Sequence, residues 1–160
     1  MNRFNSIYRH KRYRELLSRL QKLESDRKFC RHHLQHFLDV ARIMYIIDLE
    51  ENLNISKDII YSAALLHDIG RVSQYVDGIP HNEAGAAIAD EILKDCGFDE
   101  TERNRICSAI LCHRHDSAVQ NDGLSRLLSR ADKLSRNCFD CPASDECYWS
   151  SDIKNPEIQF

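Results

Sequence analysis

Residues 56–71 read SKDIIYSAALLHDIGR, and this stretch decides the fold. Ser56 can cap a helix, and Asp58 lies in its first turn, where a negative charge favours the exposed backbone N–H groups. The residues that follow are apolar on nearly every side, which predicts a helix at the centre of a core. This helix delivers the polar pair His67-Asp68 at its end, and Gly70 follows as the expected helix stop.

The rest of the chain also has the composition of a helical protein. Only 5 Gly and 3 Pro occur in 160 residues, and long β-branched runs are rare. A long helix is predicted after Ser25, with one buried stripe made of Phe29, His33, His36, Val40, Met44 and Ile47. Further helices are predicted over residues 6–23, 82–96, 99–114 and 124–136, with a loop over 71–80. The expected fold is all-α, a compact helical bundle.

Charge and targeting signals narrow the function classes. The net charge of −3 argues against a surface built throughout for nucleic acid. The basic stretch over residues 3–31 is interpreted as a solvated helix face, with a basic arm for an anionic partner as the alternative. No signal-peptide core follows Met1, and no apolar run approaches the roughly 20 residues that cross a bilayer. We therefore expect a cytoplasmic protein with reduced thiols and no membrane partner.

Several His and Asp residues stand where buried side chains are expected. His36 lies one turn before Val40, and Asp132 one turn after Leu128, so both face the core. Neutral imidazoles and carboxylates bind borderline metals such as zinc, iron and manganese, and a buried carboxylate is costly unless a cation neutralises it. The pattern therefore predicts a metal site, and its candidate ligands on separate segments are His36, His67 with Asp68, His81, His113 or His115, and Asp132.

Three motifs together carry a resemblance to a known family. They are His36-x-x-x-Val40-Ala41, Leu66-His67-Asp68-Ile69-Gly70-Arg71 and Ala131-Asp132-Lys133-Leu134. Over roughly residues 30–136 the chain resembles the HD-domain superfamily of metal-dependent phosphohydrolases. The resemblance implies an HD-type helical bundle in which a metal ion is bound by His36, His67, Asp68 and Asp132.

The sequence also looks like the dinuclear branch of that family, and is similar to the bacterial HD-type diadenosine tetraphosphate hydrolases. This likeness implies two ions of iron, manganese, zinc or nickel, with Asp68 bridging them. His81 and His113 complete the second site, and His115 is the alternative to His113. The implied reaction is cleavage of a phosphate ester or anhydride of a nucleotide or dinucleotide by a metal-activated hydroxide.

The resemblance also suggests roles for charged groups beside the ligands. Arg71, Lys133 and Arg114 are candidates for binding phosphate oxygens, which gain charge in the transition state. Arg71 and Lys133 are therefore counted with Asp68 as catalytic candidates. His115 is expected to protonate the leaving oxygen or to contact the substrate.

The C-terminal tail carries a second candidate metal site. Cys138, Cys141 and Cys147 form a C-x2-C-x5-C cluster, a spacing that fits a structural zinc ion or an iron–sulfur cluster. Cys30, Cys107 and Cys112 are the candidates for the fourth ligand. The alternative is three reduced thiols that pack the tail against the bundle, with Trp149 as an anchor. We expect residues 1–136 to form the helical domain and residues 137–160 a Cys-rich appendage.

Two other functions compete with the phosphohydrolase. The chain could be a non-catalytic module that senses a nucleotide or redox state, with a Cys-bound metal. A nucleic-acid-binding domain rests only on the basic N-terminal stretch, and nucleic acid is not the expected partner. The expected partner is a small phosphorylated molecule.

Overall fold

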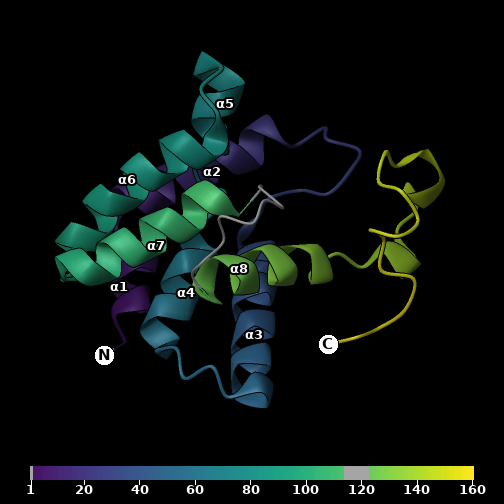
Figure 1. Cartoon of the computed structure of the whole chain (residues 1–160). Coiled ribbons are helices and arrows are strands. Elements are labelled where there is room, and N and C mark those ends of the chain that lie inside the picture. Colours follow the sequence, from purple (N-terminus) through teal and green to yellow (C-terminus); the bar gives the residue numbers. More distant parts are fainter. Residues whose placement is uncertain (1, 114–122) are drawn as a thin grey trace.

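The computed structural model describes residues 2–113 and 123–160, and these contain α-helices and no β-strand (Figure 1). The α-helices are α1 (Arg3–Arg9), α2 (Lys11–Leu23), α3 (Leu34–Glu51), α4 (Lys57–Leu66), α5 (Arg71–Asp77), α6 (His81–Asp95), α7 (Glu100–Cys112) and α8 (Gly123–Leu134). Two short 3-10 helices, η1 (Cys138–Asp140) and η2 (Ser144–Glu146), follow in the tail. The predicted all-α bundle is confirmed. None of the described helices combines the length and the apolar character needed to cross a membrane.

α4 is the central helix of the bundle, as its sequence predicts. It packs between α3 and α7 and also contacts α1 and α8 (Figure 1). Ile60, Ala63, Ala64 and Leu66 are completely buried. The small alanine side chains let neighbouring helices approach closely, so α4 ends deep inside the protein. The two polar residues that follow Leu66, His67 and Asp68, are therefore buried too.

α6 and α7 form an antiparallel pair that places two histidines at one end of the bundle (Figure 1). The chain turns at Gly97, whose φ of +79° is in the left-handed region that glycine adopts without steric cost. Asp99 then caps α7, because its side chain accepts from the Glu102 N–H at 2.9 Å while the Glu102 side chain accepts from the Asp99 N–H. His81 begins α6 and His113 follows the end of α7, so both lie at the same end.

The helix predicted over residues 6–23 is in fact two helices. α1 ends at Arg9 and α2 begins at Lys11, with His10 in an extended conformation between them. The break turns the chain so that Ile7 and Tyr13 are both completely buried. Leu23, the last residue of α2, is 44% exposed.

The predicted start of the next helix after Ser25 is also wrong. α3 begins only at Leu34, and its N-cap is His33, whose side chain accepts a hydrogen bond from the His36 N–H at 3.2 Å. The connection before it is held by Glu24, which accepts from the backbone N–H of His32 at 2.6 Å. A buried carboxylate that pairs with a residue eight positions later competes with helix formation over this segment.

The predicted loop over residues 71–80 contains a helix as well. α5 runs from Arg71 to Asp77 and is closed by Gly78, which has a φ of +72°. Val72 anchors it, because this side chain is buried in the core. The Asp77-Gly78 turn is therefore the end of a short helix.

Candidate metal centre

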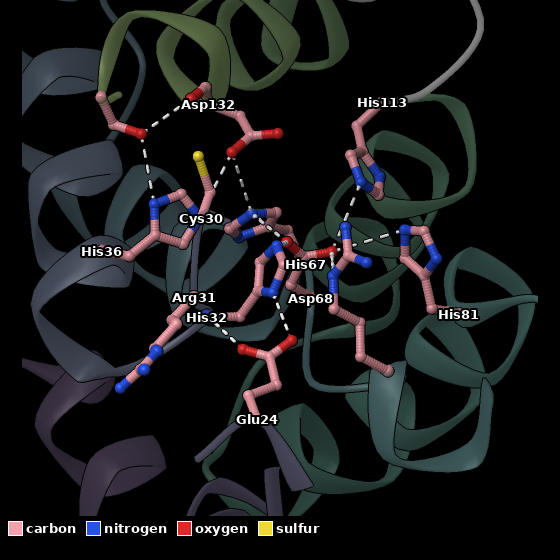
Figure 2. Close-up of polar contacts among 12 residues, drawn as sticks. Glu24, Cys30, Arg31, His32, His36, His67, Asp68, His81, His113 and Asp132 are labelled. Atoms are coloured by element: carbon pink, nitrogen blue, oxygen red, sulfur yellow. Dashed lines mark hydrogen bonds and ion pairs between the residues drawn. The ribbon is translucent and has the colours of Figure 1, made fainter. Parts of the chain in front are cut away.

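Asp68 is the hub of a buried polar cluster just beyond the end of α4 (Figure 2). Its carboxylate is completely buried. Oδ2 lies 3.2 Å from Nε2 of His67 and 3.4 Å from Nε2 of His32. Oδ1 points to other partners, 2.9 Å from Nε of Arg71 and 3.4 Å from Nε2 of His81. The two oxygens of one carboxylate thus serve different sets of neighbours.

The first set joins three parts of the fold. It consists of His36 from α3, His67 and Asp68 after α4, and Asp132 from α8, and the ligand atoms of all four lie within 4.8 Å of one another. Oδ1 of Asp132 is 3.2 Å from Nε2 of His36 and 3.7 Å from Nε2 of His67. The packing of α3 against both α4 and α8 brings these residues together.

The second set shares Asp68 with the first. Asp68, His81 and His113 also place their ligand atoms within 4.8 Å of one another. Oδ1 of Asp68 lies 3.9 Å from Nε2 of His113, and the rings of His81 and His113 are 5.5 Å apart (Figure 2). All three side chains are buried. The structure therefore groups the six residues predicted as ligands into two sets with Asp68 in common.

Hydrogen bonds turn the same ring nitrogen of three histidines toward Asp68. Nδ1 of His67 donates to the carbonyl of Ala64 at 2.8 Å, and Nδ1 of His113 donates to the carbonyl of Ile110 at 2.6 Å. Nδ1 of His81 lies 2.6 Å from Oε1 of Gln74. Because these acceptors hold a proton on Nδ1, Nε2 is the nitrogen that faces the cluster, and it offers a lone pair there whenever the ring is neutral, as in metal-binding histidines.

Unsatisfied buried atoms indicate that the cluster suits a cation. Among the described residues, both carboxylate oxygens of Asp68, Oδ1 of Asp132 and Nε2 of His67 are buried without a hydrogen bond. Such atoms are costly to bury unless another group satisfies them. The donor set of imidazole nitrogens and carboxylate oxygens fits iron, manganese, zinc or nickel. The residues present therefore fit divalent metal ions.

The carboxyl groups of Asp68 and Asp132 are both ionised, so the site carries negative charge that a cation can balance. Burial opposes the charged form of Asp68, but His67 and Arg71 outweigh it and hold the pKa of the carboxyl well below its usual range. Asp132 behaves alike, since its polar contacts with His36 and His67 overcome burial and lower its pKa. Burial would lower the pKa of His67, but the two carboxylates raise it. Two ionised carboxylates therefore share this site, Asp68 completely buried and Asp132 about 25% exposed at the edge of a cavity.

Glu24 and His32 extend the cluster in a way that the sequence did not reveal. His32 is 3% exposed, and its Nδ1 contacts Oε1 of Glu24 at 2.7 Å while its Nε2 faces Asp68. Glu24 is 2% exposed and also accepts from the Tyr75 hydroxyl at 2.8 Å. A buried Glu–His–Asp chain thus runs from the end of α2 to the hub (Figure 2). In the sequence, Glu24 is an acidic residue in a basic segment, and no motif around it indicates a buried contact with His32.

We expect Glu24 to make stability depend on pH in the acid range. Burial opposes ionisation of Glu24, but its bonds to His32 and Tyr75 lower its pKa from 4.5 to about 2. The stabilisation is thus present above the unfolded-state value and is lost as pH falls from about 4.5 to about 2, in total roughly 2–3 kcal/mol. Urea unfolding across this interval should give a flatter pH dependence for Glu24→Gln than for the wild type. Parallel curves would show that Glu24 contributes no such linkage.

Arg136 and Ser135 are further residues that the sequence did not single out. Arg136 lies just past α8 and approaches Nε2 of His36 at 3.0 Å and Oδ1 of Asp132 at 3.7 Å. The Ser135 hydroxyl lies 3.2 Å from Nδ1 of His36. Burial and the Arg136 charge lower the pKa of His36 to about 4, although Asp132 opposes this. His36 is therefore neutral, as a metal ligand must be.

A cavity of about 260 Å³ opens onto the cluster. One side of it is formed by His32, His113 and Asp132. Cationic side chains surround these groups, and they are Arg27, Arg71, Lys133 and Arg136. The C-terminal tail and the segment before α3 complete the lining, with Phe29, Cys30, Cys147, Tyr148, Trp149 and Ile153. The cavity thus combines positive charge with aromatic surface above the two ligand sets.

The structure places the remaining predicted site residues in different parts of the protein. Arg71 lies at the hub through its contact with Asp68, and Lys133 lies in the cavity wall. Arg114 and His115 lie outside the described residues, so the structure does not test the choice between His113 and His115, although it places His113 at the hub. The three tail cysteines belong to neither ligand set; they line a neighbouring cavity together with His36, and Cys147 also lines the cavity over the cluster.

Comparisons with known proteins agree with this arrangement. The model of the HD domain family matches residues 33–137 of the 160. An uncharacterized protein from Clostridium beijerinckii is 46% identical over 160 residues, covering all of both chains. The crystal structure of a predicted HD superfamily hydrolase from an uncultured Thermotogales bacterium superimposes with a TM-score of 0.62 at 26% identity, covering 88% of this chain and 80% of that one. With the matched segment spanning the residues from His36 to Asp132, the chain belongs to the HD domain family.

Proposed function

We propose that this protein is a metal-dependent phosphohydrolase that cleaves a phosphate ester or anhydride of a nucleotide or dinucleotide. One divalent ion would be held by His36, His67, Asp68 and Asp132, and a second by Asp68, His81 and His113. The observation that carries the proposal is the shared carboxylate, whose Oδ2 faces one set while its Oδ1 faces the other. A single bridging group between two ions is the arrangement that two-metal hydrolases use.

Bound divalent ions lower the pKa of water toward neutrality and polarise phosphoryl oxygens. The protein's own residues supply the rest of the site. Arg71 and Arg136 border the His/Asp cluster, and Lys133 lies in the cavity wall, so all three can bind phosphate oxygens as their charge grows. His32, whose Nδ1 contacts Glu24, faces the same Oδ2 of Asp68 as His67 does, so it can help to orient the carboxylate.

The cavity supports a nucleotide as the phosphorylated substrate. Phe29, Tyr148 and Trp149 offer aromatic surface for a base, and the same cavity is lined by cationic side chains that can bind phosphate. The volume of about 260 Å³ is slightly below the roughly 300–1,000 Å³ of typical ligand pockets. It suits one nucleoside unit better than two, so the second half of a dinucleotide would extend to the open side.

The proposal is tested by screening phosphate release over nucleotides and dinucleoside polyphosphates with protein purified without oxygen. We expect metal-dependent hydrolysis of at least one nucleotide, lost on chelation and restored by one of iron, manganese, zinc or nickel. Trp149→Ala should raise KM more than it lowers kcat, because Trp149 lies in the cavity wall and does not belong to either ligand set. A metal-replete protein that hydrolyses no member of the panel would contradict the proposal.

A further inference from the structure

Four cysteines from two distant parts of the chain line one cavity of about 330 Å³ beside the His/Asp centre. Cys30 comes from the connection between α2 and α3, and Cys138, Cys141 and Cys147 come from the tail. This cavity adjoins the one over the ligand sets, because Cys30 and Cys147 line both. The tail cysteines therefore meet a specific partner from the helical domain.

Tight turns return the tail to this cavity three times. The Cys141 N–H donates to the Cys138 carbonyl at 3.3 Å, the Ser144 N–H to the Cys141 carbonyl at 3.1 Å, and the Cys147 N–H to the Ser144 carbonyl at 3.3 Å. These bonds form η1, the turn after it and η2. Successive turns of this kind let a short segment without other regular structure place several cysteines along one cavity.

Contacts outside the cysteines fix the tail in the same place. Asn155 donates to the carbonyls of Lys133 and Arg136 at 2.8 and 2.7 Å, and Lys154 donates to the Ser144 carbonyl at 2.7 Å. The Phe29 and Tyr148 rings pack edge to face with centroids 6.2 Å apart. The tail thus closes on the segment that carries Cys30.

The other three cysteines lie elsewhere. The Cys107 thiol donates to the Ala86 carbonyl at 3.5 Å, in the contact between α6 and α7. Cys96 caps the far end of α6, beside Asp95. Neither these two nor Cys112 lines the four-cysteine cavity. Of the candidates for a fourth ligand to the tail cluster, the fold therefore selects Cys30 over Cys107 and Cys112.

The chemistry of the four thiols favours a soft cation between them. Burial raises the pKa of Cys30, Arg136 lowers it, and the three tail thiols raise it further. Mutual repulsion of this kind is removed when a metal ion accepts the sulfurs as thiolates. Among the described residues, only the His/Asp sets already hold three or more ligand atoms within 4.8 Å, so ion binding has to draw the sulfurs together.

We propose that Cys30, Cys138, Cys141 and Cys147 bind one structural Zn²⁺ in a tetrathiolate site. Four cysteines complete the tetrahedral shell of a structural zinc ion and leave no position for catalysis. The ion would fasten the tail to the helical domain and hold the wall that Tyr148 and Trp149 contribute to the cavity over the His/Asp centre. This site is separate from the proposed catalytic ions in ligands and in role.

Thiol protection in the whole protein tests the site without any substitution. Reduced, metal-free protein is titrated with Zn²⁺, alkylated, and mapped by mass spectrometry. We expect Cys30, Cys138, Cys141 and Cys147 to become protected together, while the labelling of Cys96, Cys107 and Cys112 stays unchanged. Unchanged labelling of all seven, or protection of a set that lacks Cys30, would overturn the proposal.

Cobalt substitution gives a second readout that is specific to sulfur ligands. Co²⁺ bound by thiolates shows sulfur-to-metal charge-transfer bands, which the His/Asp sets do not produce. We expect Cys30→Ser and Cys141→Ser to lose these bands and one ion per chain, and the control Cys107→Ser to keep both. Bands that survive Cys30→Ser would refute the assignment. Since these signals do not depend on hydrolysis, they separate failure of this site from failure of the proposed activity.

Discussion

Asp68→Asn is expected to lower kcat/KM by at least about 10³-fold, because the site would lose several kcal/mol of metal-based stabilisation. Asp68 belongs to both ligand sets, and its two oxygens face different histidines. An amide offers only one neutral oxygen, so neither set keeps its full charge. Steady-state hydrolysis of the best substrate from the screen, at saturating metal, measures the effect.

Asp77→Asn is the matched control for this prediction. Asp77 is an exposed aspartate at the end of α5 and belongs to neither ligand set, so the same substitution there should leave kcat/KM unchanged. The amide has nearly the same size and shape as the carboxylate, and circular dichroism should show that both variants keep their helical content. Folded Asp68→Asn protein with activity close to that of the wild type would exclude Asp68 from the chemistry.

Gly70→Ala is expected to give the largest loss of stability from a single added methyl group. A Cβ at this position would lie 2.1 Å from the His81 carbonyl oxygen and 2.4 Å from the Gly85 nitrogen, both backbone atoms of α6. Backbone atoms cannot rotate away, so α6 has to shift. We expect a cost at the upper end of the roughly 1–3 kcal/mol for overpacking, or about 6–12 °C in Tm for a domain of this size.

The control comes from the other side of the same contact. A Cβ on Gly85 would meet the Ile110 Cγ2 atom at 3.4 Å, which is ordinary van der Waals contact. Gly85→Ala should therefore change Tm little, because the added methyl fits and alanine favours the helix. Thermal unfolding of the two variants makes the comparison. Equal losses of Tm would show that the close approach of α6 does not explain why residue 70 is a glycine. Activity should fall with stability in Gly70→Ala, since the shifted helix carries His81.

The central helix and the ligand residues could be predicted because their signals are local. A run of apolar residues on every side of α4 is readable without the fold, and so is a polar pair at its end. His36 and Asp132 follow from helical periodicity, which places each on a buried stripe. The fold then groups these residues, because α3 and α8 pack against each other and α3 packs against α4.

What the sequence could not predict depends on contacts between distant segments. Glu24 is one acid among many until the fold buries it against His32 and Tyr75. That same contact moves the start of α3 from the position after Ser25 to Leu34. Gly70 has an ordinary backbone conformation, with φ of −68°, and only the approach of α6 explains why it carries no side chain. The choice of Cys30 as the fourth ligand of the tail cluster likewise depends on the path of the tail, which the sequence does not show.

The most direct measurement of the central claim is the number of catalytic ions per chain in protein purified without oxygen. Elemental analysis, combined with the sulfur-specific signals of the tail, counts ions at the His/Asp sets separately. We expect two such ions in the wild type, one in His81→Ala and fewer than one in Asp68→Asn. Full retention of both ions by the folded Asp68→Asn protein would contradict this expectation, because the carboxylate common to both sets would then hold neither.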